Sequence, residues 1–588
     1  MSCRTFRLVG CVFLFAITLP APGEAQSPLS SIKWRAIGPV NTSGRIDDIA
    51  VARVRGEADA IYVATASGGL WKSANNGVSW SPVFDGVDAM MSIGAVAVAP
   101  SSQLTVWVGT GEANTRQSSS WGDGAYKSSD GGKTWSNMGL RDTRSIARVV
   151  IDPTDPNIVY VAAQGHLWGP NTERGVFKTA DGGKNWKKVL FVDENTGATD
   201  LVIDPDNPQV LYAAMYQRQR RTWGFNGGGP GSNIYKSTDA GATWTKLAKG
   251  LPAGEKGRIG LSLYASDPKI VYATVEARSP EGGIYRTLDA GATWEKMSSL
   301  NSRPSYYSQI RIDPRDHDRI YTLGSNRGFY FSNDGGKNFT ELFSNVHGED
   351  HALWVDPENT NHLIIGGDGG VSITWDRGKT WDFRRNMPIG QFYEVDVDQS
   401  VPFRICGGLQ DNGVWCMPSA VRNRNGIADR DVWNIGGGDG FHAHFDPLNN
   451  AMVLQSSQNG NAAWVNIETM ERQSARPGTG DAPAAGGGRG AAGGARWNWD
   501  APIVVSRIDP RTWYMGSQFL YKSTDRASSW QKISGDLTLN VNRDTLKMMG
   551  GRRGHRRTLA PRRTVELRIA HVHRRVTAER DGHLHRER

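Results

Sequence analysis

An eight-residue pattern, Ser/Thr-x-Asp-x-Gly-x-x-Trp, recurs along this chain of 588 residues. Its regular copies occupy 128–135, 179–186, 237–244 and 287–294. Further copies, most of them weaker, occupy 73–80, 332–339, 374–381 and 523–530. A repeat of this kind is typical of an array of small units, each of which buries its apolar face against its neighbours. No other feature of the sequence restricts the possible folds as strongly.

The residue types of the repeat describe a tight turn between two strands. An Asp side chain can accept hydrogen bonds from the backbone N–H groups of its own turn. Glycine adopts a positive φ without steric cost, and a terminal Trp is large enough to fill the space between two sheets. We therefore interpret the aspartates of the repeat as turn-formers and not as catalytic residues.

A second motif, an Asp-Pro turn between two apolar segments, precedes several copies of the repeat. It occupies 150–160, 202–212, 312–321 and 355–365. The unit is then strand, Asp-Pro turn, strand, loop, strand, eight-residue turn, strand, and it recurs every 42 to 58 residues. Four strands in that length are typical of a β-propeller blade, so the sequence predicts an all-β fold.

Counting the units suggests how the blades are grouped. Seven regular units end near Trp381, and three looser ones follow. We expect a seven-bladed β-propeller over 32–390 and an incomplete second propeller of three blades over 391–548. A single ten-bladed propeller is the alternative. The Gly/Ala-rich stretch 475–496 is expected to be a flexible surface insertion.

The N-terminus has the pattern of an export signal. Arg4 and Arg7 precede an apolar stretch over 8–19, and small residues at Gly23 and Ala25 offer a cleavage site. The apolar stretch is too short for a typical membrane span. The sequence predicts a signal peptide over 1–25, a secreted or periplasmic protein, and no membrane span.

Two cysteines, Cys406 and Cys416, remain after such a cleavage. They flank Asn412-Gly413, which is a strong signal for a tight hairpin. An oxidising compartment allows them to form a disulfide across the hairpin. Two buried free thiols are the alternative.

The net charge of +9 does not indicate a nucleic-acid partner. Residues 551–588 contain 12 Arg and 4 acidic residues, a balance of +8, so the rest of the chain is near +1. We expect 549–588 to be an Arg/His-rich disordered tail, or an out-of-frame one, and we expect no nucleic acid as a partner.

Strand order predicts where a ligand binds. The tight turns share one face of the propeller, and the irregular loops share the opposite one, which is where binding sites usually lie. Exposed aromatic side chains there can stack on sugar rings or hold apolar side chains of a peptide, although they could equally pack the loops together. The candidate ligand-binding residues are Glu112, Trp121, Trp168, Trp223, Tyr307, His347, Asp350 and His351.

His347 and His351, with Glu349 and Asp350, are residue types that bind metals. No helix is predicted there, so a spacing of four residues carries no geometric meaning. We expect polar loop residues here, no metal site and no cofactor.

The eight-residue turns resemble the Asp-boxes of bacterial neuraminidase (BNR) repeats. From Trp34 to about 548 the chain is similar to large secreted bacterial propeller proteins described as glycosyl-hydrolase-like or sortilin-like. Members of this group are longer, which is consistent with an interrupted second propeller. Sialidases of this repeat class carry an Arg-Ile-Pro motif, and Arg45-Ile46-Asp47 lacks the proline, which argues against that activity.

Xyloglucanase-type enzymes combine two seven-bladed propellers and take one catalytic Asp from each. Their first motif resembles 62–69, where the family's aspartate falls on Ala66. Their second motif resembles 438–442 and retains Asp439. Because glycoside hydrolysis needs two carboxylates, Asp368 or Asp411 would have to replace the missing one. The candidate catalytic residues are Asp439, Asp368 and Asp411.

These observations lead to a functional expectation with two alternatives. We expect an exported, non-catalytic propeller that binds an extracellular polysaccharide or polypeptide on its long-loop face. The first alternative is a glycoside hydrolase acting on a β-glucan-type polysaccharide, and the second is a sortilin-like peptide-binding protein.

Overall fold

The computed structural model describes residues 37, 42, 44–53, 59–324, 327–343, 347–478, 495–542, 545–549 and 551–552. The chain divides into a short unit, 1–37, and a second unit, 38–588, and only the second concerns the fold below. The expected signal peptide, most of the Gly/Ala-rich insertion and nearly all of the tail lie outside the described residues. Across the described part of the chain, no helix is long and apolar enough to cross a membrane.

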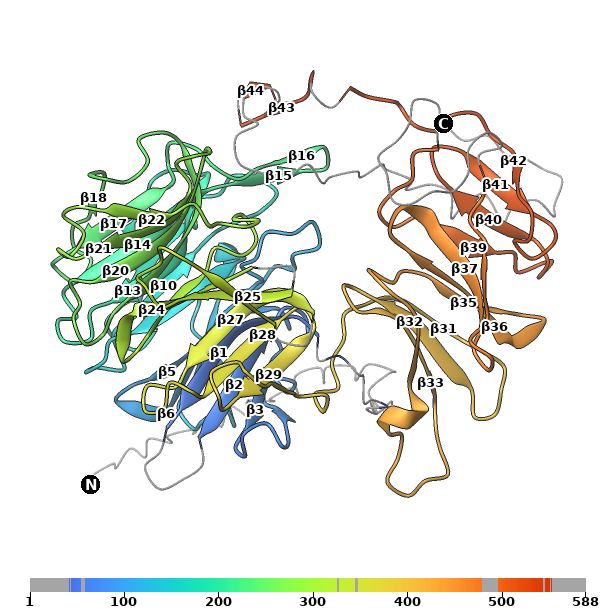
Figure 1. Ribbon diagram of the computed structural model, residues 1–588, viewed down its shortest axis with the longest axis horizontal. Coiled ribbons are helices and arrows are strands. Elements are labelled where there is room, and N and C mark those ends of the chain that lie inside the picture. The colour runs from blue at the N-terminus through green and yellow to red at the C-terminus, as the bar shows by residue number, and fades with distance from the viewer. Residues whose placement is uncertain are drawn as a thin grey trace, which may run out of the picture. The chain divides into compact units, whose positions relative to one another are not determined.

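The described residues form eight four-stranded antiparallel sheets and one eight-stranded sheet over 310–383, which consists of two four-stranded antiparallel parts (Figure 1). These ten four-stranded units are called sheets 1 to 10 in chain order. Sheet 1 consists of β1 (Ile46–Ala52), β2 (Ala60–Thr65), β3 (Leu70–Ser73) and β4 (Ser81–Pro82), and sheet 2 of β5 (Ile93–Ala99), β6 (Ser102–Thr110), β7 (Ala125–Ser128) and β8 (Ser136–Asn137). Sheet 3 consists of β9 (Ile146–Ile151), β10 (Val159–Ala163), β11 (Gly175–Thr179) and β12 (Lys187–Leu190), and sheet 4 of β13 (Thr196–Ile203), β14 (Leu211–Gln217), β17 (Asn233–Ser237) and β18 (Thr245–Lys246).

Sheet 5 consists of β19 (Lys256–Leu263), β20 (Val271–Ala277), β21 (Gly283–Thr287) and β22 (Glu295–Ser298). Sheet 6 consists of β23 (Ile310–Asp313), β24 (Asp316–Leu323), β25 (Arg327–Ser332) and β26 (Thr340–Phe343), and sheet 7 of β27 (Gly348–Val355), β28 (Leu363–Gly367), β29 (Gly370–Thr374) and β30 (Asp382–Phe383). A short parallel pairing between β25 and β27 joins sheets 6 and 7.

Sheet 8 consists of β31 (Phe392–Val397), β32 (Arg404–Leu409), β33 (Gly413–Pro418) and β34 (Trp433–Gly436). Sheet 9 consists of β35 (Ala443–Asp446), β36 (Asn449–Ser457), β37 (Asn461–Asn466) and β38 (Arg472–Ser474), and sheet 10 of β39 (Ile503–Val505), β40 (Trp513–Gly516), β41 (Leu520–Ser523) and β42 (Gln531–Lys532). Two small hairpins, β15 (Gln219–Arg221) with β16 (Gly224–Asn226) and β43 (Lys547–Met548) with β44 (Gly551–Arg552), lie outside these sheets. Short 3-10 turns occupy Arg141–Thr143, Asp429–Asp431 and Gln458–Gly460.

Each Asp-box connects the third and fourth strands of its sheet, as expected from the sequence. In sheet 4 the Asp239 carboxylate accepts hydrogen bonds from the Thr243 backbone N–H at 2.8 Å and from the Ser237 hydroxyl at 2.8 Å. Gly241 has a φ of +84° and donates its N–H to the Ser237 hydroxyl. The aspartate is thus occupied by its own turn, which confirms the interpretation as a turn-former.

Consecutive sheets pack face to face through large side chains. Trp107 of sheet 2 is fully buried against sheet 3, where its ring meets Trp186 edge-on at 6.0 Å between centroids. Replacing such a buried Trp with Ala typically costs about 3–5 kcal/mol. Sheets 8 and 9 share a core through Ile435 and Phe445, and sheets 9 and 10 share one through Trp464 and Trp513.

Sheet 1 also packs against sheet 7. Ile46 and Val63 belong to the same buried cluster as Ile364 and Val371. Beyond β30, the Asn386 side-chain amide donates to the Val78 backbone carbonyl at 2.7 Å. The first and seventh sheets are therefore direct neighbours.

Two local features refine the expectations for sheets 8 to 10. Cys406 and Cys416 face each other across β32 and β33, are both buried and form a disulfide. Ala475, expected to begin the flexible insertion, is instead buried in the core of sheets 9 and 10, where its carbonyl accepts a hydrogen bond from the Trp530 indole at 2.8 Å. Ala475 therefore belongs to this core, because its side chain fills space between the two sheets.

Candidate functional site

Segments from several sheets meet in a polar cluster on the long-loop face, defined here as the side that carries the loops opposite the Asp-boxes. Arg45 precedes β1, and Arg116 follows β6. Tyr306 precedes β23, while Asp368 and Asp411 lie in the short turns after β28 and β32. Loops between second and third strands and connections between sheets share one face, so residues far apart in sequence are brought together.

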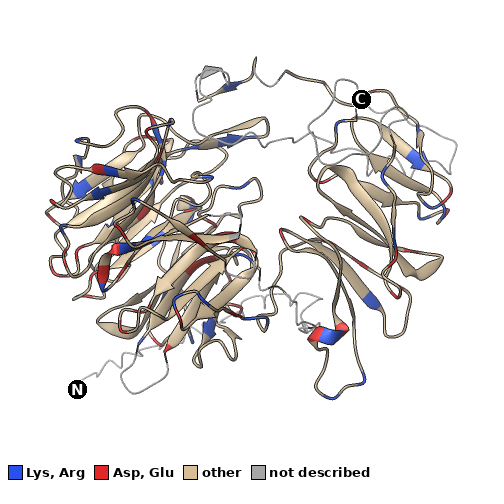
Figure 2. Ribbon diagram, viewed as in Figure 1, with Lys and Arg blue, Asp and Glu red and all other residues tan. Residues whose placement is uncertain are grey.

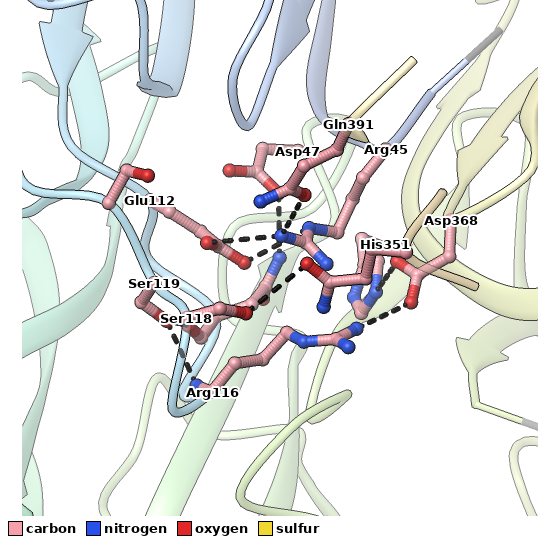
Figure 3. Close-up of polar contacts among 12 residues, drawn as sticks. Arg45, Asp47, Glu112, Arg116, Ser118, Ser119, His351, Asp368 and Gln391 are labelled. Carbon is pink, nitrogen blue, oxygen red and sulfur yellow. Dashed lines mark hydrogen bonds and ion pairs between the residues drawn. The ribbon is translucent and has the colours of Figure 1, made fainter. Parts of the chain in front are cut away.

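Arg45 and Glu112 form a buried ion pair at the centre of this cluster (Figure 3). The Arg45 Nε lies 3.1 Å from Glu112 Oε1, and its Nη2 donates to the Gln391 side-chain oxygen at 3.0 Å. Burial raises the pKa of Glu112, and burial together with Glu112 raises the pKa of neighbouring Asp47. Glu112, predicted as a ligand-binding residue, is instead buried against the arginine, because a carboxylate at this depth requires a cation.

Arg116 holds two of the predicted catalytic aspartates together. Its Nη1 lies 2.9 Å from Asp368 Oδ2 (Figure 3). The same nitrogen lies 3.0 Å from Asp411 Oδ2 and donates to the Tyr306 hydroxyl. The Arg45 Nη1 lies 3.5 Å from the same Asp411 oxygen. Although burial alone would raise the pKa of Asp411, these two guanidinium groups hold it well below the usual range, so Asp411 remains ionised.

Asp368 has partners on both of its oxygens. His351 Nε2 lies 2.8 Å from Oδ1, while Arg116 and the Tyr306 hydroxyl contact Oδ2. Burial, followed by the neighbouring Asp411, raises the pKa of Asp368. Burial also lowers the pKa of His351 well below its usual value, so this imidazole is neutral.

Asp350 and His351 do not lie in a loop as predicted, whereas Tyr307 lies in the loop before β23. Asp350 and His351 lie within β27 and are buried. Tyr307 is buried too, with its ring 5.7 Å from the His351 ring. Of these three residues, His351 contacts the Asp368 carboxylate directly. His347, just before β27, is partly exposed.

Asp439 lies in the connection between β34 and β35, and it contacts Asp411 in the turn after β32. Its Oδ1 accepts a hydrogen bond from the Asp411 backbone N–H at 2.7 Å, and its Oδ2 accepts one from the Trp499 indole at 2.8 Å. Burial, with a smaller contribution from the Asp411 charge, raises the pKa of Asp439 to about 6. Adjacent carboxyls with pKa values pushed apart resemble an acid and base pair.

Ala66, on which the xyloglucanase resemblance places the first family aspartate, directly follows β2. It is buried, and its N–H donates to the Arg45 carbonyl at 3.0 Å. The structure brings the three candidate aspartates into one cluster, and Ala66 is hydrogen-bonded to the Arg45 backbone beside it.

The aromatic loops differ in how much they expose. Trp121 is 59% exposed and lies under the Arg144 guanidinium, and Trp168 is 36% exposed. Trp223, predicted to be exposed, is half-buried in the turn of the β15–β16 hairpin. Only the first two of these indoles therefore offer a substantial face to a ligand.

Hydrogen bonds tie these three loops into one surface. Arg218 donates to the Thr115 hydroxyl at 3.1 Å, which links the loops of sheets 4 and 2. The Arg220 backbone N–H donates to the Leu167 carbonyl at 2.8 Å, which links the loops of sheets 4 and 3. The loops are therefore positioned by one another as well as by their strands.

Several residues at the centre of the cluster were missed by sequence reasoning. Arg45 enters the sequence argument only through a missing motif, and no motif in the sequence points to Arg116 or Gln391 as site residues. A lone arginine inside a long loop that also contains an acidic residue is a weak signal. It becomes informative only when the fold brings carboxylates from sheets 7 and 8 beside it.

The repeats, the sheets and the shared long-loop face define this chain as a β-propeller protein built from Asp-box, or BNR, repeats. Its residues 123–281 and 282–403 match the profile of the Sortilin-Vps10 family, described as sortilin, neurotensin receptor 3.

Among proteins of known activity, the chain is similar to xyloglucanases. It is 30% identical to a xyloglucanase from Paenibacillus sp. over 230 residues, which cover 34% of this chain and 20% of that enzyme. It is 28% identical to a xyloglucanase from Hypocrea jecorina over 219 residues, 32% of this chain and 24% of that enzyme. The matched region thus spans less than a quarter of the length of either relative.

The fold has a counterpart among solved structures. The structure of the GH74 xyloglucanase from Xanthomonas campestris superposes with a TM-score of 0.51 at 17% identity, covering 85% of this chain and 81% of that enzyme. At this identity the likeness concerns the fold alone.

Proposed function

We propose that this chain is an exported, glycoside-hydrolase-like β-propeller that binds an extracellular polysaccharide on its long-loop face without cleaving it. One observation carries the proposal: each of the three candidate carboxylates is engaged by protein groups, and a methyl group occupies the position of the carboxylate expected in the first propeller.

The chemistry of glycoside hydrolysis explains why this observation matters. The reaction needs two carboxyl groups that flank the scissile bond, one to protonate the leaving oxygen and one to act as base or nucleophile. Asp368 is buried and has partners on both oxygens. Asp439 and Asp411 adjoin each other within the same cluster. Ala66 cannot supply the second carboxyl group.

The proposed architecture is a closed seven-bladed ring over about 32–390, followed by three blades of a second propeller over 391–548. The packing of Ile46 on Val371 supports closure between sheets 1 and 7. The same contact argues against a single ten-bladed ring, in which sheet 1 would pack against sheet 10.

A polysaccharide is favoured as the ligand because the long-loop face combines two exposed indoles with polar loops. Trp121 and Trp168 offer flat apolar surfaces that can stack on sugar rings. Two relatives of the chain are named xyloglucanases. A sortilin-like peptide ligand is the competing outcome of the experiment below.

The test measures binding of the secreted chain to xyloglucan and other soluble β-glucans by affinity electrophoresis and calorimetry. We expect Trp121→Ala to weaken binding at least about tenfold. Stacking of a nucleic-acid base on an aromatic side chain is worth on the order of 1–3 kcal/mol, and we expect a stacked sugar ring to contribute a similar amount. Trp375→Ala is the matched control: Trp375 is 50% exposed but lies in the Asp-box of sheet 7, on the opposite face. Equal effects of both substitutions, or binding to peptides only, would contradict the proposal.

A second function, hydrolysis of a β-glucan, is favoured by one observation. Asp439 has a pKa raised to about 6, whereas Asp411 beside it remains ionised. If Asp439 is a general acid, reducing-sugar release should fall as the pH rises through about 6, because the required proton is lost. Sugar release that disappears in Asp439→Asn would establish hydrolysis and overturn the non-catalytic proposal.

A further inference from the structure

Two neighbouring strands carry metal-ligand side chains outside the carboxylate cluster. His442 immediately precedes β35 of sheet 9, and His444 is the second residue of that strand. Glu394 and Asp396 are likewise separated by one residue on β31 of sheet 8. Alternate residues of a strand point to the same face, so each strand presents a pair of ligands.

Packing between the two sheets brings these pairs together. Glu394 Oε2 lies 2.7 Å from His442 Nδ1, and Asp396 Oδ2 lies 3.7 Å from His444 Nδ1. One ligand atom from each of Glu394, His442 and His444 can be chosen so that all three lie within 4.8 Å of one another. That separation is compatible with a shared ion at bond lengths of about 2.0–2.2 Å after small side-chain rotations.

The outer nitrogens of both imidazoles face acceptors. His442 Nε2 lies 3.4 Å from Asp500 Oδ1, and His444 Nε2 lies 3.2 Å from the Ile503 carbonyl oxygen. A metal-binding histidine usually donates its second ring N–H to a carboxylate or a backbone carbonyl, which orients the ring. Both histidines can therefore present Nδ1 to the same point.

We propose that Glu394, His442 and His444, with Asp396 or a water as the fourth ligand, form a binding site for a divalent transition-metal ion of the Zn²⁺ type. Two imidazole nitrogens and one or two carboxylates suit Zn²⁺, whereas Ca²⁺ requires six to eight oxygen ligands. The Glu394 side chain is 44% exposed, so an ion can enter from solvent. The site connects sheets 8 and 9 and does not depend on the proposed function.

The experiment titrates the chelator-treated full chain with ZnCl₂ by calorimetry. We expect one tight site, lost in the Glu394→Gln, His444→Ala double variant. Asp500→Asn, which alters only the group orienting His442, should weaken Zn²⁺ binding by about 10- to 100-fold.

A second histidine pair in the same chain supplies the matched control. His571 and His573 have the same spacing and belong to the His-rich tail, outside the described residues. The His571→Ala, His573→Ala variant should keep the tight site. Circular dichroism and the melting temperature check that each variant is folded. If Zn²⁺ binds the native state of the parent, it should raise the parent's melting temperature.

Loss of the tight site in the Glu394/His444 variant, with retention in the His571/His573 variant, supports the proposal. No Zn²⁺ binding by the folded parent, binding that persists in the Glu394/His444 variant, or binding lost only with the tail histidines would overturn it.

Discussion

Asp-box carboxylates show how one side chain can define a repeat. Hydrogen bonds from Thr243 and Ser237 lower the pKa of Asp239 to about 2. The same is found for Asp181, Asp289, Asp334, Asp376 and Asp525, whose pKa values also lie at about 2. The carboxylate form is preferred because its oxygens accept N–H and O–H groups of the same turn.

These pKa values predict a loss of stability in acid. A folded-state pKa of about 2 lies below the unfolded value of about 3.9, so each box contributes stability that is present above about pH 4 and lost as the pH falls toward 2. The melting temperature should therefore drop steeply over that interval.

Asp239→Asn provides the matched comparison, because Asn75 already occupies this position in sheet 1 and accepts a hydrogen bond from the Ser79 N–H at 2.9 Å. The variant should fold and show a shallower drop in melting temperature with acid. An identical pH dependence in parent and variant would contradict this assignment.

At the cluster on the long-loop face, the Arg116 guanidinium lies 2.9 Å from Asp368 and 3.0 Å from Asp411. Arg116→Met should lower the free energy of unfolding by about 3–5 kcal/mol, because it removes the ion-pair partner of buried Asp368 and leaves Asp411 with the longer contact to Arg45, at 3.5 Å. Urea denaturation measures the change. Arg141→Ala, which removes an exposed pair with Asp123, should cost at most about 1 kcal/mol, and an equal cost would refute the special role of Arg116.

At the scale of elements, the repeat spacing predicts the strands well. Asp-box turns lie between the third and fourth strands, and Asp-Pro turns lie between the first and second, as in β9 and β10 on either side of Asp152. Gly and Asp have strong local preferences for these turns, so they could be predicted from sequence. The burial of Tyr307 and His351 could not, because it depends on which sheet packs over β27.

The hairpin of β32 and β33 carries a stability prediction. Replacing both Cys406 and Cys416 with Ser should lower the free energy of unfolding by about 2–3 kcal/mol, because the closed loop is short. Guanidinium denaturation of the oxidised parent, the reduced parent and the variant measures this effect. The reduced parent should match the variant, and no difference between oxidised and reduced parent would show that the crosslink contributes little.

For the whole molecule, basic and acidic residues are interspersed over the described sheets (Figure 2), and hydrophobic packing between neighbouring sheets provides the main stabilisation. Each core cluster joins two consecutive sheets, except that sheet 1 packs on sheet 7. That cluster contains residues more than 300 positions apart, such as Ile46 and Val371. The repeat pattern does not predict which sheet packs against sheet 1.

The proposed ring closure predicts the behaviour of fragments. A fragment of residues 38–390 should fold cooperatively, because it retains the packing of sheet 1 on sheet 7. A fragment ending at Phe343 lacks sheet 7 and exposes Ile46 and Val63, so it should be aggregated or unfolded. Circular dichroism, thermal melting and gel filtration compare the two, and similar behaviour would contradict closure at sheet 7.

The sequence by itself determined the all-β fold, the four-stranded unit, the role of the Asp-box aspartates and the face on which to look for function. These features depend on the chemistry of individual turns and on the regular spacing of the repeat, and both can be recognised in short segments of sequence. Only the tertiary structure decided that Arg45 and Arg116 neutralise Glu112, Asp368 and Asp411. The physical reason is that burial and ion pairing are properties of residues brought together from distant sheets, and a repeat pattern does not encode their distances.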